Sequence, residues 1–172
     1  MDLKKHIRAI PDWPKKGIIF RDITTLIANP EAMKYAMKLF KDRYADKKID
    51  KVVGIESRGF IFGALLAYEL ELPFLIIRKK DKLPPPVEGI EYELEYGKDC
   101  IEISQGAIEK GDKVLIIDDL LATGGTFAAS AELVEKLGGE VVELACVIDL
   151  PDVHTDKLKG RPLFTLVEFE GE

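Results

Sequence analysis

Residues 114–127 read VLIIDDLLATGGTF, a stretch in which four apolar residues lead directly into two acids and then into a turn of small residues. The apolar part is typical of a buried strand, whereas two adjacent carboxylates repel each other and are costly to bury unpaired. Gly124 and Gly125 are poor helix residues, yet the residues after them have helical character. The stretch therefore predicts a strand, a turn and a helix, with an acid pair that folding alone does not explain.

Apolar strands and helices alternate along the rest of the chain. We expect strands at 51–55, 73–78, 113–118, 140–149 and 162–169, and helices at 30–44, at about 59–70 and from Gly124 to the stop at Gly138–Gly139. Strands of continuous Val, Ile and Leu that alternate with helices indicate an α/β fold, with a mostly parallel twisted sheet flanked by helices on both faces. A chain of 172 residues without repeats or long linkers is expected to form a single domain over 1–172.

The segment 79–104 has a different pattern. It is rich in charge and proline at first and then alternates, with Tyr92, Leu94 and Tyr96 on one face. We expect an exposed loop that leads into a β-hairpin, an insertion of the kind that often acts as a lid.

The composition is that of an ordinary globular protein, with 47% hydrophobic and 33% charged residues. The net charge of −6 argues against a nucleic-acid partner, and no apolar run approaches the ~20 residues that span a membrane. The first thirteen residues lack the features of a secretory signal. Cys100 and Cys146 are far apart and fit buried thiols in a reducing compartment, so we expect a cytoplasmic protein. His6 and His154 have no partner at metal or triad spacing and receive no role.

The turn ATGGT at 122–126 has the features of a phosphate site. In open parallel sheets, ligands bind beyond the carboxyl ends of the strands, and backbone N–H groups at a helix N-terminus bind phosphate when glycine allows close approach. Thr123 and Thr126 can add hydroxyl donors. The turn is neither a P-loop nor a GxGxxG dinucleotide motif. Asp118 and Asp119, expected to be exposed at the strand end, can accept hydrogen bonds from sugar hydroxyls or hold a magnesium shell through water. The alternative is a solvated acid pair beside a tight turn.

The stretch VLIIDDLLATGGT resembles the phosphoribosyl-pyrophosphate (PRPP) motif of the type I phosphoribosyltransferases. Within that family the chain is similar to the adenine phosphoribosyltransferases over nearly its whole length. The other matching segments, in order, are IPDWPKKGIIFRDIT at 10–24, ESRGFIFG at 56–63, IRKKDKLP at 77–84 and LEYG at 94–97. The resemblance implies the type I phosphoribosyltransferase fold with a hairpin lid, and a role in purine salvage. The reaction would transfer the 5-phosphoribosyl group of PRPP to N9 of adenine, giving AMP and pyrophosphate.

The resemblance also implies how PRPP is held. Asp118 and Asp119 would bind the ribose hydroxyls. The 5′-phosphate would lie on Ala122, Thr123, Gly124, Gly125 and Thr126. Pyrophosphate would be bound by Glu56, Ser57 and Arg58 after the first strand and by Arg78, Lys79 and Lys82 of the lid. Glu56 stands where the family frequently has aspartate or a small residue, and Lys80 belongs to the basic run without being carried over. Charge runs such as this one are otherwise solvated faces.

For the chemistry, the resemblance implies Glu95 as the acid–base residue near the imidazole edge of the purine and Tyr96 against the ribose or leaving group. The alternation of Glu91, Glu93 and Glu95 equally fits an exposed hairpin, and Glu102 is a second candidate acid.

The base would be read by the N-terminal segment 1–29. Phe20 would stack on adenine, backbone groups of Ile19 and Arg21 would pair with its N1/N6 edge, and Leu150 would cover its other face.

Magnesium is the implied cofactor, held mainly by PRPP and water with no direct protein ligand. The family also implies a homodimer, with FRDITTL at 20–26 packed across the interface. Three alternatives stay open: a sister transferase for xanthine, hypoxanthine or guanine; a PRPP- or purine-sensing regulator on the same fold; and a nucleotide-binding module without chemistry.

Overall fold

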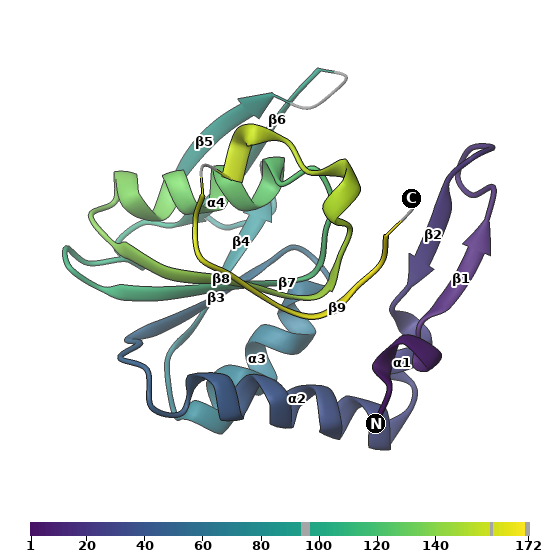
Figure 1. Cartoon of the computed structure of the whole chain (residues 1–172). Coiled ribbons are helices and arrows are strands. Elements are labelled where there is room, and N and C mark those ends of the chain that lie inside the picture. Colours follow the sequence, from purple (N-terminus) through teal and green to yellow (C-terminus); the bar gives the residue numbers. More distant parts are fainter. Residues whose placement is uncertain (94–96, 159, 171–172) are drawn as a thin grey trace.

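The computed structural model describes residues 1–93, 97–158 and 160–170. Within these residues, one sheet is built from β3 (Lys51–Ile55), β4 (Phe74–Lys79), β5 (Val87–Glu93), β6 (Lys98–Ser104), β7 (Lys113–Leu121), β8 (Glu140–Asp149) and β9 (Leu163–Glu168). Its spatial order is β5-β6-β4-β3-β7-β8-β9, as Figure 1 shows. The strands from β4 to β9 in this order are parallel, which confirms the predicted mostly parallel sheet.

Helices cover both faces of the sheet (Figure 1). On one face lie α2 (Pro30–Tyr44) and α3 (Gly59–Leu70), and on the other lies α4 (Gly125–Lys136). The start of α2 is capped by Asn29, whose side chain accepts hydrogen bonds from the Glu31 and Ala32 amides. The short elements are η1 (Leu3–His6), α1 (Thr24–Ile27), η2 (Pro151–Val153) and η3 (Asp156–Leu158). The predicted helix at 30–44 and the strands at 51–55 and 140–149 match the observed bounds.

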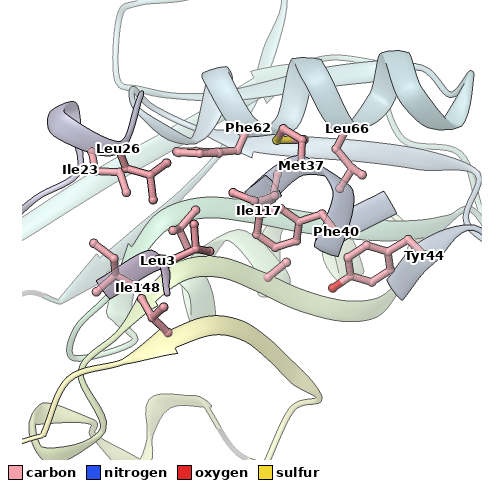
Figure 2. Packing of buried hydrophobic residues seen from close by; sticks show 14 of the residues in the cluster. Leu3, Ile23, Leu26, Met37, Phe40, Tyr44, Phe62, Leu66, Ile117 and Ile148 are labelled. Carbon is pink, nitrogen blue, oxygen red and sulfur yellow. The ribbon is translucent and has the colours of Figure 1, made fainter. Parts of the chain in front are cut away.

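The hydrophobic core has two parts, one on each side of the sheet. Successive residues of β7 alternate between them: Leu115 and Ile117 pack toward α2 and α3, whereas Val114 and Ile116 pack toward α4. Figure 2 shows Ile117 among Phe40, Phe62 and other buried residues of the first part. Burial on both faces explains the unbroken apolar runs. It also fixes the position of the carboxyl ends of these strands.

The hairpin of β5 and β6 extends this sheet. β6 pairs antiparallel with β4, through Arg78–Glu102 and Lys79–Ile101, and β5 pairs antiparallel with β6. The expectation of an exposed loop over the first part of 79–104 holds for 80–86, whereas the paired strands are part of the main sheet. Because β6 pairs with β4, the hairpin forms one end of the main sheet.

Two features differ from the sequence prediction. The strand predicted at 113–118 continues to Leu121, because β7 keeps pairing with β8 through Leu120–Ile148 and Leu121–Asp149. The acid pair therefore lies within the strand ladder. In the N-terminal segment, β1 (Arg8–Pro11) and β2 (Ile19–Asp22) form a separate antiparallel hairpin, which stands apart from the main sheet in Figure 1.

Candidate active site

The carboxyl ends of four parallel strands bring distant motifs together. Loop 56–58 follows β3, the basic run begins at the end of β4, turn 122–126 follows β7, and Leu150 follows β8. Since β4, β3, β7 and β8 are parallel neighbours, these segments lie at one edge of the sheet. This is the edge at which open α/β sheets bind ligands.

The turn after β7 encloses a cavity of about 210 Å³, lined by Asp118 and by the residues from Leu120 to Phe127. Gly124 has φ +86°, and a Cβ there would lie 2.8 Å from Leu158, so both the backbone and the packing require glycine. Gly125 opens α4, which directs the unpaired N–H groups of the helix start toward the turn. This geometry is suited to an anion.

The segment 151–158 supports the turn from outside. The Thr155 hydroxyl donates to the Thr123 carbonyl oxygen over 2.8 Å, and the Lys157 ammonium donates to the Glu93 carbonyl oxygen over 2.7 Å. Thr155 and Lys157 were not predicted from the sequence, because their partners, Thr123 and Glu93, are distant along the chain. They attach the turn, the hairpin and the C-terminal segment to one another.

The acid pair is less exposed than predicted. Asp119 is 5% exposed, and its carboxylate accepts a 2.6 Å hydrogen bond from Nε of Arg58. The expectation of two exposed carboxylates is therefore wrong for Asp119, because the continued strand turns its side chain inward. Asp118 is half-buried and accepts a hydrogen bond from the Asp119 amide. Burial, with Asp119 beside it, raises the pKa of Asp118 well above its usual value.

The start of α3 lies directly against these acids. A Cβ on Gly59 would lie 2.8 Å from Oδ1 of Asp118 and 2.8 Å from the Ile117 carbonyl oxygen. Glycine at this position therefore lets loop 56–58 approach β7, which brings Arg58 within reach of Asp119. The peptide between Glu56 and Ser57 is cis, a feature that the sequence could not reveal.

Glu56 anchors the end of β4. Its carboxylate accepts hydrogen bonds from the Lys79 amide at 2.8 Å and from Arg78 at 3.2 and 3.3 Å, while Arg78 donates to the Lys82 carbonyl oxygen at 2.7 Å. Burial alone would raise the pKa of Glu56, but these hydrogen bonds outweigh it and lower that pKa. These contacts tie loop 56–58 to the start of the basic loop; the predicted role of Glu56 in binding pyrophosphate stays a prediction.

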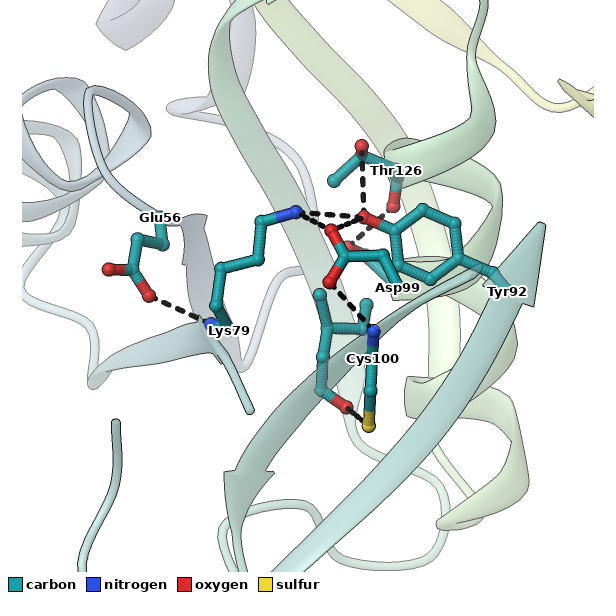
Figure 3. Close-up of polar contacts among 8 residues, drawn as sticks. Glu56, Lys79, Tyr92, Asp99, Cys100 and Thr126 are labelled. Atoms are coloured by element: carbon teal, nitrogen blue, oxygen red, sulfur yellow. Dashed lines mark hydrogen bonds and ion pairs between the residues drawn. The ribbon is translucent and has the colours of Figure 1, made fainter. Parts of the chain in front are cut away.

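Lys79 points away from Arg78, as neighbouring residues of a strand do. Figure 3 shows its ammonium among Asp99, Tyr92 and Thr126, on the side of the strand away from the Glu56 carboxylate. The ammonium donates to the Tyr92 hydroxyl over 3.2 Å and forms an ion pair with Asp99. The predicted basic cluster is therefore divided: Arg78 lies beside Glu56, and the ammonium of Lys79 lies beside Tyr92 and Asp99.

The candidate base-binding residues of β2 have aromatic neighbours. Phe20 is half-buried and packs edge-to-face against Trp13, with ring centroids 4.5 Å apart. The Arg21 guanidinium lies 4.0 Å from the centroid of Phe169. Trp13 and Phe169 were not among the predicted site residues. Trp13 could have been noticed as the chain's one tryptophan, in a turn with two prolines.

Glu95 and Tyr96 lie outside the described residues, and so does Leu94. Glu102 is 8% exposed and its carboxylate accepts from the Asp81 amide at 3.0 Å. The second candidate acid therefore holds the loop after β4.

The remaining polar candidates have structural partners. His154 lies 2.5 Å from the Asp149 carboxylate, a pair that forms because η2 folds back on the end of β8. Cys146 is fully buried, Cys100 is half-buried, and both are free thiols. Among the described residues, no three His, Cys, Asp or Glu side chains converge as a metal site, and no helix is long and apolar enough to cross a membrane.

A strand with an acid pair, a glycine turn and a basic loop meet at one end of the sheet, as expected of a phosphoribosyltransferase. Residues 22–161 match the family described as phosphoribosyl transferase domain. Over its full length the chain is 56% identical to adenine phosphoribosyltransferase of Desulfosudis oleivorans, with 100% of both chains covered. The structure of adenine phosphoribosyltransferase from Thermoanaerobacter pseudethanolicus superposes with a TM-score of 0.93 at 44% identity, covering 98% of each chain.

The enzyme from Saccharomyces cerevisiae, solved with an imino-altritol bisphosphate and adenine, has a TM-score of 0.86 and 39% identity over 96% of this chain and 97% of its own. The chain belongs to the adenine phosphoribosyltransferase family.

Proposed function

We propose that this sheet edge carries out the reaction of the family in purine salvage. The 5-phosphoribosyl group of PRPP is transferred to N9 of adenine, and AMP and pyrophosphate are formed. The observation that supports this most strongly is the meeting of loop 56–58 with the acid pair and turn 122–126 at one strand edge. A sugar that carries a phosphate at each end needs this combination of donors and acceptors.

The PRPP sugar is proposed to lie between the turn and the acids. The amides and hydroxyls of Ala122, Thr123, Gly124, Gly125 and Thr126 bind the 5′-phosphate. Asp118 and Asp119 accept hydrogen bonds from the 2′ and 3′ hydroxyls. In the protein without PRPP, the guanidinium of Arg58 compensates the negative charge of Asp119.

Pyrophosphate is proposed to lie between loop 56–58 and the basic loop. Ser57 and Arg58 are exposed and offer a backbone amide and a planar guanidinium to phosphate oxygens. Arg78, held by Glu56, and the exposed Lys82 face the same loop. These cations stabilise the charge that develops as pyrophosphate departs.

Magnesium fits this site as a companion of PRPP. Two neighbouring carboxylates, one of them paired with Arg58, suit an outer shell of waters better than a direct protein cage. Asp118 and Asp119 would hold the ion through water. The ion would neutralise charge on the pyrophosphate.

Adenine is proposed to lie against β2. Phe20, braced by Trp13, stacks on the purine. The backbone of Ile19 and Arg21 pairs with the N1/N6 edge, and Leu150 covers the other face. The yeast relative was solved with adenine, which supports the choice of base.

In the proposed reaction the C1′–oxygen bond to pyrophosphate breaks, and its electron pair leaves with pyrophosphate. The N9 lone pair forms the new bond to C1′, and the proton of the adenine imidazole passes to Glu95. Tyr96 lies against the ribose or the leaving group. Holding both reactants in place and excluding water protect the activated donor from hydrolysis.

Incubation with PRPP, magnesium and one purine at a time tests the function. AMP from adenine, with little or no nucleotide from hypoxanthine, guanine or xanthine, is expected. IMP, GMP or XMP without AMP would contradict the substrate. PRPP binding without turnover would favour a sensor.

A homodimer is proposed through the outer face of α3. Ile61, Leu65 and Tyr68 are 37%, 41% and 79% exposed and recur at helical spacing, beside an apolar groove on α2. That groove has lysines on the α2 side and Glu69 on the α3 side. Lys41 and Glu69 pair within the chain over 2.6 Å, so a two-fold contact would bury the apolar residues beside an already paired charge.

The 20–26 segment stays a second candidate interface: Ile23 and Leu26 are buried in their own chain at 2% and 0% exposure, whereas Thr24 is exposed. Light scattering is expected to give twice the chain mass for the unaltered protein and the single mass for Leu65→Asp. A monomer in both would contradict the interface.

We propose the cytoplasm as the location, which the two free thiols support.

A further inference from the structure

Turn 122–126 contains no basic residue, although the proposed ligand is a dianion. A cation nevertheless lies close by. The Tyr92 hydroxyl is 3.5 Å from Oγ1 of Thr126 and accepts a hydrogen bond from the Lys79 ammonium (Figure 3). Tyr92 of the hairpin therefore lies between the Lys79 ammonium of β4 and the Thr126 hydroxyl of the turn. The carboxylate of Asp99 completes the cluster.

We propose that Tyr92 is a positioning residue for the 5′-phosphate: with Lys79 and Asp99 behind it, its hydroxyl orients the Thr126 hydroxyl toward the phosphate. The inference rests on the proposed function of the turn. It assigns Lys79 to the 5′-phosphate side of the site and leaves Arg78 and Lys82 to pyrophosphate.

The directions of the hydrogen bonds explain why a tyrosine is needed. Tyr92 donates its proton to Asp99 and accepts from Lys79, so the remaining lone pair of its hydroxyl can accept from Thr126. A phosphate oxygen accepts only, and it needs the Thr126 proton for itself. Tyr92 can then turn its own proton to Thr126 and replace the lost bond. No proton is transferred, and Lys79 continues to compensate Asp99.

The charge state of the cluster supports this exchange. Burial alone would lower the pKa of Lys79, but its hydrogen bonds with Asp99 and Tyr92 outweigh burial and raise that pKa. Burial likewise opposes ionisation of Asp99, but the hydrogen bonds from Lys79 and the Cys100 amide lower its pKa. Both groups therefore stay charged near neutral pH, and Tyr92 always has an acceptor and a donor beside it.

The test compares two ligands that share only one end of PRPP each. Ribose 5-phosphate probes the 5′-phosphate site, and magnesium pyrophosphate probes the other. Tyr92→Phe should weaken binding of ribose 5-phosphate about fivefold, the effect of one neutral hydrogen bond, and raise the KM for PRPP. It should leave pyrophosphate binding unchanged and kcat within about twofold of the unaltered value. Tyr35→Phe on α2 is the matched control and should change nothing.

A double-mutant cycle identifies the route of the effect. Thr126→Val should weaken ribose 5-phosphate binding, and adding Tyr92→Phe to it should cause no further loss. Unchanged binding in Tyr92→Phe, equal loss of both ligands, or additive losses would each overturn the inference. Failure of the unaltered chain to bind ribose 5-phosphate would instead overturn the proposed function of the turn.

Discussion

Two charged clusters lie on the neighbouring strands β8 and β7, one around Glu143 and the other around Asp118 and Asp119, and they differ in charge balance. Glu143 on β8 is 4% exposed and accepts hydrogen bonds from Arg43 at 2.7 and 3.2 Å and from Lys47 at 3.0 Å. On β7, the Arg58 guanidinium bonds Asp119, whereas the bonded donor of Asp118 is the Asp119 amide; no further ion pair of the two acids occurs among the described residues. Glu143 thus has two cationic partners, whereas Asp118 and Asp119 together have one.

The pKa directions follow this balance. Burial alone would raise the pKa of Glu143, but hydrogen bonds from Arg43 and Lys47 lower it. At Asp118, burial and the neighbouring acid raise the pKa. The first cluster fastens α2 to the sheet and is complete by itself. The second is under-compensated, and the ligand proposed above, with its hydroxyls and magnesium, would supply the missing partners.

The largest effect on stability is expected from Arg58→Met. Asp119 is buried and would lose its guanidinium, so we expect a loss of about 3 kcal/mol in the free energy of unfolding at pH 7. Urea unfolding measures it. Arg43→Met is the matched control, in which Glu143 keeps Lys47 and the loss should be about 1 kcal/mol. Equal losses would contradict the difference in charge balance.

Asp118→Asn should reduce kcat/KM for PRPP about 30-fold, the loss expected for a charge-assisted hydrogen bond of ~2 kcal/mol. The amide keeps the size of the side chain and can still accept from the Asp119 amide. Steady-state formation of AMP is the measurement. Glu143→Gln, the same change in the balanced cluster, should leave kcat/KM within about twofold. A similar activity loss in both variants would deny the acid pair its role.

Glu143→Gln should instead lower stability by about 1.5 kcal/mol at pH 7, a modest loss because Arg43 and Lys47 can still reach water at 40% and 30% side-chain exposure. The folded-state pKa of Glu143 is lowered, so its stabilisation is present above the unfolded pKa of ~4.3 and is lost as the pH falls through the folded value. Unfolding measured from pH 7 down to pH 3 should show the two proteins converging in acid. A constant difference would rule out the ion pair as its source.

The sequence predicts the parts of this fold that depend on local pattern. Strands buried on both faces read as apolar runs, and α2 begins at a proline preceded by a capping asparagine. The glycine turn after two acids is likewise a local signal. Together with four further motifs, it predicts a PRPP site at the end of this strand.

The side-chain partners could not be predicted in the same way. Arg58 and Asp119 are 61 residues apart and meet only because β3 and β7 are neighbours. Whether Lys79 faces pyrophosphate or the turn depends on the register of β4, since one residue reverses the side-chain direction. The β1–β2 hairpin was not predicted from the sequence, because its two short strands flank a turn with no strong hairpin signal.

The most direct test is the melting temperature of the unaltered chain and of Asp118→Asn, each with and without PRPP and magnesium. The raised pKa means that ionised Asp118 costs stability, and this cost grows above the unfolded pKa of ~3.9. Asp118→Asn should therefore melt higher than the unaltered chain at pH 8 without ligand. PRPP should raise the melting temperature of the unaltered chain more than that of the variant. A variant that melts lower without ligand, or an equal rise in both proteins, would contradict the account.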